Sequence, residues 1–238
     1  MTLYRDQGVV LRTLRLGEAD RIVTMVTQGH GKVRAVVKGV RRTTSKFGGR
    51  LEPISHVAVL CWAGRELDIV TQADMLDTFG RVRGDLARLA KAYTLIEVVD
   101  QVAQEGHANR RLYEMLVGAL RVLDDDDPPL MVAAFALKVL SVEGAAPGLD
   151  ACASCGDEGD LVAFDALEGG VLCRSCRRGR PVSPAALSVL RTILGGGLRD
   201  ALSQPASPVT DEVTELATES MELHLDRRLR TVRGTPAH

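Results

Sequence analysis

The chain has 238 residues, of which 45% are hydrophobic and 26% are charged, and its formal net charge is −1. This composition is ordinary for a globular protein and excludes a disordered chain, a collagen-like repeat and a small disulfide-bonded scaffold. A net charge near zero argues at first sight against nucleic-acid binding, because domains that bind nucleic acid are usually strongly basic. The sequence has no secretory signal and no apolar stretch of membrane-spanning length, so we expect a cytoplasmic location.

The charge is unevenly distributed along the chain. Eight basic residues and no acidic residue lie between Arg21 and Leu51, so the rest of the chain carries a net charge of −9. Screening limits the reach of a charge to about 8 Å at physiological salt, so a phosphate near this segment experiences the local positive charge rather than the average. A solvated basic face that binds nothing gives the same pattern, and both interpretations stay open at this point.

The first 80 residues predict a small β-barrel. Apolar alternation and β-branched runs indicate about five short strands, near residues 4–14, 22–27, 32–39, 55–62 and 67–73. A five-stranded Greek-key barrel of the OB type fits this number and length, and a small SH3-like barrel fits the pattern as well. We expect Phe47 to anchor the long basic loop against the barrel and Trp62 to belong to its core.

Alternation in the third strand gives the barrel a charged face. It places Lys32, Arg34, Val36 and Lys38 on one side of the strand and Val33, Ala35 and Val37 on the other. We therefore expect one side to pack in the core and the other to present cations.

From about residue 80 the apolar spacing becomes helical. We expect helices near residues 86–99 and 110–123, and Asn109 is the predicted cap of the second. Asp127-Pro128 and Ser183-Pro184 each indicate the start of a further helix, and a last helix is expected over about 208–231. The last helix would end with Arg227, Arg228 and Arg230, where the helix dipole favours cations. The predicted fold is α+β, with a barrel domain over residues 1–80 and an α-helical domain over 81–238 that carries an insert at about 150–180.

The strongest chemical signal is a set of four cysteines. Cys152, Cys155, Cys173 and Cys176 have the spacing C-x2-C-x17-C-x2-C, which is typical of a four-cysteine zinc site. Four thiolates close the coordination sphere of Zn²⁺, so the predicted role of one zinc ion is structural. A redox dithiol and metal-free packing cysteines are the alternatives. We expect the fifth cysteine, Cys61, to be a buried free thiol.

Motifs of covalent catalysis are missing from the sequence. Lys32 follows Gly31, but position 26 is Val, so the P-loop pattern is absent, and Gly195-Gly196-Gly197 follows a helix rather than a strand. No histidine lies beside a cysteine pair. We therefore expect a protein that is not an enzyme.

Several strings of residues resemble the RecO family of DNA repair proteins. In the first 55 residues they are Gly8-Val-Val-Leu11, Gly17-Glu18-Ala-Asp20-Arg-Ile22, Gly31-Lys32-Val33, Lys38-Gly39-Val-Arg41 and Lys46-Phe47-Gly48-Gly49-Arg50-Leu51-Glu52-Pro53. Further along, Leu149-Asp150, the two cysteine pairs and Gly169-Gly170 resemble the zinc-binding element of the family. The resemblance extends to about residue 230.

This resemblance implies an OB fold followed by a helical domain with a zinc finger. It implies a recombination mediator that binds single- and double-stranded DNA, anneals complementary strands and, with RecR, helps to load RecA onto DNA covered by the single-stranded DNA-binding protein SSB. Such a protein would be associated with the nucleoid. The residues that match the basic motifs of the family, and to which DNA contact is assigned, are Arg34, Lys38, Arg41, Arg42, Lys46 and Arg50.

Two other functions compete with this interpretation. A zinc-ribbon adaptor would use the basic barrel to dock protein partners alone, and a general RNA- or DNA-binding module would bind nucleic acid without annealing it. Few aromatic residues lie near the basic segment, so we expect DNA binding to be mostly electrostatic.

Overall fold

The computed structural model describes residues 2–41, 45 and 47–231, and it divides into two units, Met1–Asp125 and Asp126–His238. The expected boundary near residue 80 marks the passage from strands to helices along the chain, whereas the division by contacts groups the first three helices with the strands.

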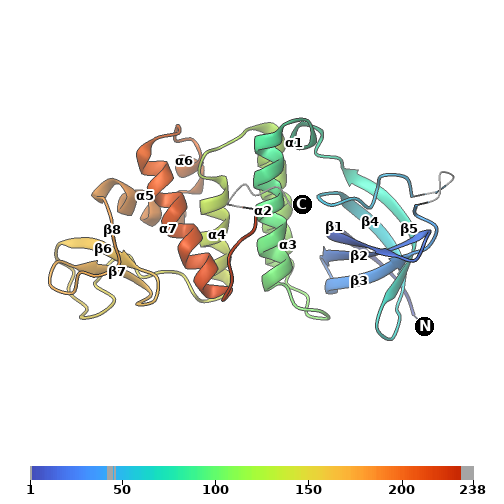
Figure 1. Cartoon of the computed structure of the whole chain (residues 1–238), viewed down its shortest axis with the longest axis horizontal. Coiled ribbons are helices and arrows are strands. Elements are labelled where there is room, and N and C mark those ends of the chain that lie inside the picture. Colours follow the sequence, from blue (N-terminus) through green and yellow to red (C-terminus); the bar gives the residue numbers. More distant parts are fainter. Residues whose placement is uncertain (1, 42–44, 46, 232–238) are drawn as a thin grey trace. The chain divides into compact units, whose positions relative to one another are not determined.

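Five strands of the first unit form a closed barrel in the order β1-β2-β3-β5-β4 (Figure 1). They are β1 (Leu3–Leu16), β2 (Asp20–Thr27), β3 (Gly31–Val37), β4 (His56–Trp62) and β5 (Asp68–Asp77). The insertion of β5 between β3 and β4 distinguishes this barrel from a simple meander, and β3 and β5 are its one parallel pair. A closed five-stranded barrel followed by helices confirms the predicted fold class.

A β-bulge in β1 changes the alternation that the sequence predicts. The register with β2 shifts between Val10 and Arg12, and Val9, Val10 and Leu11 are all buried. Beyond the bulge, Arg12 and Leu14 face outward. Strict alternation of faces therefore does not hold along this strand, because an extra residue at a bulge reverses the faces of those that follow.

The barrel core consists mainly of valine, alanine and other small or aliphatic side chains from all five strands. Phe47 is 3% exposed and packs against this core, which confirms its predicted role as the anchor of the loop. The prediction for Trp62 is wrong. Its neighbour Cys61 points into the core as a fully buried free thiol, as predicted, so alternation turns the indole outward, where it is 39% exposed.

Three helices complete the first unit: α1 (Gly80–Gly84), α2 (Leu86–Val102) and α3 (Arg110–Asp125). Asp85, which the sequence did not single out, caps α2 by accepting the backbone N–H of Arg88. Asn109 accepts the N–H of Leu112, as the sequence predicts. Both longer helices contact β1.

A buried polar network ties α3 to the barrel. The Nδ1 atom of His56 lies 2.7 Å from the Asp77 carboxylate, and Nε2 lies 2.8 Å from the Tyr113 hydroxyl. Arg121 donates to the same carboxylate at 2.9 Å. Burial alone would raise the pKa of Asp77, but the bonds from His56 and Arg121 hold that pKa below its usual value.

The second unit consists of four helices around one core and a small sheet in the order β7-β6-β8. The helices are α4 (Met131–Val142), α5 (Pro184–Leu194), α6 (Leu198–Leu202) and α7 (Pro208–His224), and the strands are β6 (Leu161–Asp165), β7 (Gly170–Cys173) and β8 (Arg180–Pro181). Ser183 caps α5 by accepting the N–H of Ala186, as its sequence signal predicts. The sheet forms the insert expected between the helices.

Two predicted helix ends are wrong. The helix expected to open at Asp127-Pro128 begins at Met131. Asp124, a few residues earlier, accepts the backbone N–H groups of Arg81 and Val82 in α1. The last helix ends at His224, before the three arginines that were expected to lie in its final turn. Asp226 adopts a left-handed backbone conformation there, with φ of 49°.

Candidate metal centre and nucleic-acid interface

The four predicted cysteine ligands lie together in the second unit. Cys152 and Cys155 lie in the turn that precedes β6, and Cys173 and Cys176 lie at the end of β7 and in the turn after it. Their four Sγ atoms all lie within 4.8 Å of one another, and those of Cys155 and Cys173 are 3.7 Å apart. The structure therefore brings the whole predicted set together around one point.

These distances fit a metal ion rather than a disulfide. Zn–S bonds of about 2.3 Å in a tetrahedron put the sulfur atoms about 3.8 Å apart, whereas a disulfide needs about 2.05 Å. All four cysteines are free thiols. Backbone N–H donation, first from Cys173, lowers the pKa of Cys152 to about 6. Four cysteine thiols are a donor set for a soft or borderline ion, and no coordination position is left for a substrate.

Tight backbone contacts shape the two turns that carry the cysteines. Gly156 has φ of 78°, and its N–H donates to the carbonyl of Cys152 at 2.8 Å. Gly170 pairs with Gly148, and a Cβ atom at Gly170 would come within 2.2 Å of the Gly148 carbonyl oxygen. Only glycine fits there, so the hairpin of β6 and β7 can rest against the preceding loop and hold the cysteine pairs in place.

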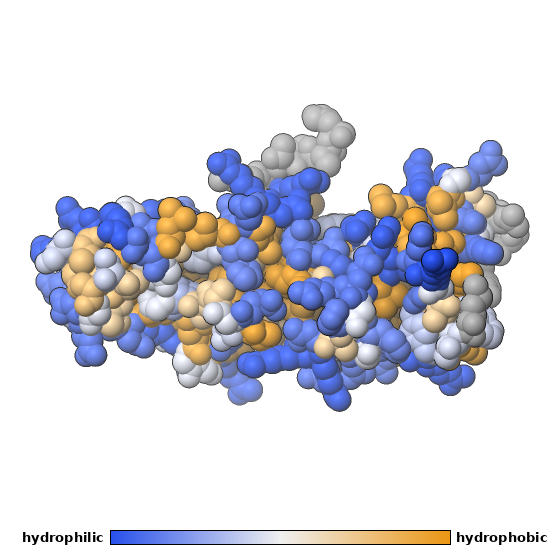
Figure 2. Space-filling view, turned by 90° about the horizontal axis from the view of Figure 1, so that it is seen from below, coloured by the Kyte–Doolittle hydropathy of each residue, from blue (hydrophilic) through white to orange (hydrophobic). Residues whose placement is uncertain are grey.

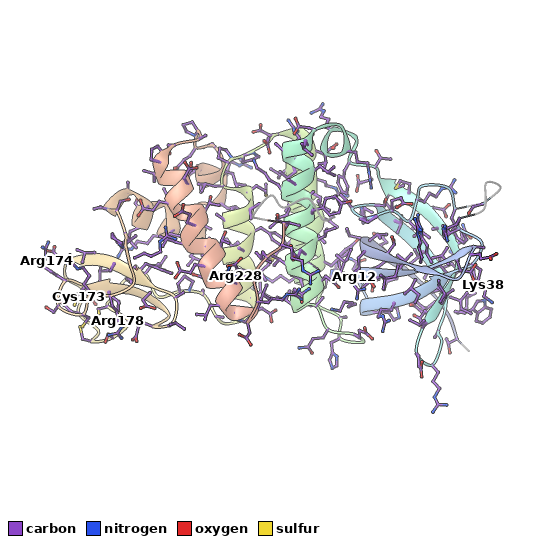
Figure 3. The ribbon with its side chains drawn as sticks, in the orientation of Figure 1. Arg12, Lys38, Cys173, Arg174, Arg178 and Arg228 are labelled. Carbon is purple, nitrogen blue, oxygen red and sulfur yellow. The ribbon has the colours of Figure 1, made fainter. Side chains whose placement is uncertain are left out.

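The arginines around the cluster pair with acids. Arg174 pairs with Asp160 at 3.3 Å and Arg178 with Glu168, while Arg180 pairs with Glu215 on α7. Figure 3 shows Arg174 and Arg178 beside Cys173 at the hairpin. The described ion pairs of these arginines are therefore with carboxylates.

The second candidate site is the outward face of β3. Lys32, Arg34 and Val36 point outward there and are half-buried, and Lys38 follows the strand and is exposed. Their alternation with buried Val33, Ala35 and Val37 agrees with the pattern in the sequence. Of the predicted DNA contacts, this face carries Arg34 and Lys38.

The remaining predicted contacts lie in or near the segment that follows β3. The guanidinium of Arg41 donates to the carbonyl oxygens of Gly17 and Glu18, so it braces the turn between β1 and β2. Arg50 is exposed. Arg42 and Lys46 lie outside the described residues.

Arg12 and Lys32 also lie on this face, although neither is among the predicted DNA contacts and the sequence did not single out Arg12. Arg12 pairs with Asp100 of α2 at 2.8 Å, and Lys32 donates to the Asp100 carbonyl oxygen at 2.6 Å. Thr24 pairs in register with both Arg12 and Arg34, so these two arginines flank it on the sheet. The hairpin turns in the sequence could have indicated that register; the bulge in β1 could not be read from the sequence.

Acids of the first unit partly neutralise the face at the end near the helices. The Nε atom of Arg34 lies 3.9 Å from Glu105, and both side chains stay partly open to water, at 37% and 57% exposure. Lys38 has no ion pair among the described residues. Figure 3 shows Arg12 on the side of the barrel near α2 and α3, and Lys38 at the far end. The far end of the face therefore carries the less compensated positive charge.

Comparison with known proteins assigns the chain to a family. A family model described as "Recombination protein O N terminal" matches residues 1–79, and one described as "Recombination protein O C terminal" matches residues 83–233. A relative from Streptomyces griseus subsp. griseus, named DNA repair protein RecO, is 42% identical over 245 residues, which cover 98% of each chain. The chain belongs to the RecO family. The resemblance found in the sequence is thus confirmed along nearly the whole chain. Among the described residues of this RecO-family chain, no helix is long and apolar enough to cross a membrane.

Proposed function

We propose that this chain is a DNA repair and recombination mediator that binds single- and double-stranded DNA through the basic face of its barrel. The face extends over Arg34, Lys38, Arg41 and Arg50, with Arg42 and Lys46 in the same stretch of sequence. The observation that supports this proposal most directly is the outward row of cations on β3, in a stretch of sequence without acids. Membership of the RecO family supports the biological role.

The same surface suits strand annealing. Cations that hold the backbones of two strands lower the repulsion between them, and they leave the pairing edges of the bases free. Annealing of complementary strands, and the loading of RecA onto SSB-covered DNA together with RecR, belong to this proposal. The role is that of a binding protein, with no covalent step, and its expected location is the cytoplasm, in association with the nucleoid.

We further propose that the four-cysteine cluster holds one structural Zn²⁺. The closed thiolate set and the sulfur spacing support this ion. When bound, zinc would join the turn before β6 to the end of β7. The residues of the hairpin position the thiols, and neither they nor the ion takes part in a reaction.

The experiment that tests DNA binding is a salt series. If four to six phosphates are neutralised, the logarithm of the affinity for single-stranded DNA should fall against the logarithm of the salt concentration with a slope of roughly −3 to −4. Lys38→Gln should reduce the steepness of that slope by about 0.7. Arg110→Gln is the control, because Arg110 is an exposed arginine of α3 in the same unit and pairs only locally with Glu114.

Annealing of complementary strands in the presence of SSB then separates the candidate functions. Binding together with annealing supports a recombination mediator. Binding without annealing would indicate a general nucleic-acid module. An affinity that stays flat across the salt series, or no DNA binding at all, would refute the proposal in favour of an adaptor that binds only proteins.

A further inference from the structure

The segment between α2 and α3 lies across one end of the basic face of the barrel. It covers residues 103–109, and we call it the strap; in Figure 1 it is the loop that joins the two helices at the end away from α1. Glu105 forms a bridge with Lys32 of β3, and the N–H of Lys32 donates to the carbonyl oxygen of Gln104 at 3.0 Å. The strap therefore adds to the edge of β3 as a short extra strand would.

The strap and the end of α2 place negative charge against three cations. Asp100, in the last turn of α2, pairs with Arg12 at 2.8 Å, and its carbonyl oxygen accepts from Lys32 at 2.6 Å. Glu105 of the strap lies 3.9 Å from the Nε atom of Arg34. Asp100 adds to the partial negative charge that the carboxyl end of a helix carries. The three cations thus face carboxylates and carbonyl oxygens where a phosphate would offer them the same charge.

This contact leaves polar atoms unsatisfied. Two buried side-chain atoms have no hydrogen-bond partner among the described residues, Nε of Arg34 and Oδ1 of Asp100, and both lie in this contact. Oδ1 of Asp100 is 3.6 Å from the Lys32 ammonium, which is an ion pair without a hydrogen bond. A buried polar atom without a partner costs free energy, so the strap is held less firmly than its charges suggest. A phosphate, with its strong acceptor oxygens, would satisfy Nε of Arg34 better than Glu105 does.

The strap is exposed and has few packing contacts. Residues 104–108 are exposed, and Ala103, where the strap leaves α2, is its buried residue. Gly106 has a left-handed φ of 72°, and a Cβ atom there would meet no other atom within 4 Å. Figure 2 views the molecule from that end of the two helices, and hydrophilic residues predominate on the surface there. Because local opening is easiest where few apolar contacts are lost, the strap needs little free energy to leave the barrel.

We infer that the strap is an autoinhibitory device, which occupies Arg12, Lys32 and Arg34 in the free protein and is displaced by the phosphates of a DNA backbone. This inference rests on the proposed function and adds a means of regulating it. DNA first meets cations outside the contact, such as Lys38, and its phosphates then compete with the two acids for the other three. The last turn of α2 frays as the strap leaves. When DNA dissociates, the acids return to the cations, so binding is readily reversed.

A substitution at Gly31 displaces the strap without a change of charge. Gly31 has φ of 70°, and a Cβ atom there would lie 2.2 Å from the carbonyl oxygen of His107 in the strap. Gly31→Ala should raise the affinity for DNA about five- to tenfold at low salt, because the cost of opening the strap is removed. The gain should shrink as salt rises, because salt screens the ion pairs that hold the strap in the wild type.

Gly144→Ala is the matched control for this variant. Gly144 has φ of 74°, and a Cβ atom there would meet nothing within 4 Å, so the substitution brings similar backbone strain without a clash. Gly144 follows α4 in the second unit, outside the strap and the basic face. The control should bind DNA like the wild type. Thermal unfolding of each variant checks that it remains folded.

Cleavage of the wild-type protein by a glutamate-specific protease detects the movement itself. Glu105 lies in the strap, and Glu168, in the exposed turn between β6 and β7, is the reference within the same chain. We expect duplex DNA and oligothymidylate each to speed cleavage after Glu105 relative to Glu168. A strap that stays in place under bound DNA would be covered, and cleavage after Glu105 would slow instead. In Gly31→Ala, cleavage after Glu105 should be fast without DNA.

The outcomes separate this inference from the proposed function. DNA binding with unchanged or slower cleavage after Glu105 overturns the inference and leaves the proposed function standing. A folded Gly31→Ala variant that binds DNA like the wild type also overturns it. If that variant does not fold, cleavage of the wild type decides alone. Absence of DNA binding refutes the proposed function and the inference with it.

Discussion

Removal of the Tyr113 hydroxyl tests how firmly the buried network attaches α3 to the barrel. Tyr113 is 4% exposed, and its hydroxyl meets the Nε2 atom of His56, which is 3% exposed. The other ring nitrogen already bonds Asp77. In Tyr113→Phe, Nε2 therefore loses its partner in a place that water does not reach.

The expected cost follows from that geometry. A buried polar group left without a partner costs about 1–3 kcal/mol. A loss of about 2 kcal/mol corresponds to a fall in Tm of roughly 4–8 °C for a chain of this size. Tyr93→Phe is the matched control, because Tyr93 on α2 is 39% exposed and its hydroxyl can bond water in either state. The control should change stability by less than about 0.5 kcal/mol.

Urea unfolding followed by Trp62 emission is the suitable assay, since the only tryptophan lies in the first unit. The midpoint should fall for Tyr113→Phe and stay in place for Tyr93→Phe. Equal midpoints for the two variants would refute the reasoning that the network stabilises this unit.

Three other predictions follow from the site and the core. Glu105→Gln should raise affinity for DNA about two- to fivefold in a low-salt anisotropy titration, because Arg34 loses a competing carboxylate. The control Glu114→Gln should leave the affinity unchanged, and an equal rise in affinity for both variants would point to net charge alone. Elemental analysis of purified protein should find one metal ion per chain in Cys61→Ser and none in Cys155→Ser. A wild-type protein without metal would contradict the zinc proposal. Burial raises the pKa of Cys61 to about 12, so the native thiol keeps its proton where the unfolded one ionises. The free energy of unfolding should therefore fall between about pH 9 and pH 12. Cys61→Val should lessen that fall in urea midpoints measured across this range.

The sequence predicts helix caps and the cysteine cluster correctly because residues close together in the chain determine these features. Ser183-Pro184 and Asn109 each place a capping oxygen beside a helical stretch, and both cap as predicted. The cysteine spacing likewise predicts a cluster because two short turns on one hairpin meet without help from the rest of the chain.

Distant contacts account for the errors. The helix predicted to open at Asp127-Pro128 begins at Met131, and Asp124, in the run of acids before it, bonds α1 more than forty residues earlier in the chain. After His224, burial of Leu229 and a bond from its N–H to the Glu222 carboxylate redirect the backbone away from the helix. Neither partner is apparent from a local window of sequence.

The outward face of the barrel shows the same limit at the candidate site. Sequence alternation gives the outward side of each strand, and it identified the cations of β3. Which outward residue lies beside which depends on the register between strands, including the parallel pairing of Val36 with Ile69. Composition suggested that aromatic residues contribute little to DNA binding, and only the register places Trp62 in line with the basic strand.

The parallel junction of β3 and β5 also affects the motion of the barrel. In the described part of the chain, β3 and β5 share two residue pairs, Ala35 with Asp68 and Val36 with Ile69, whereas β1 and β4 share seven. The barrel therefore closes at its weakest junction, and local opening should begin there, with faster amide hydrogen exchange than along β1.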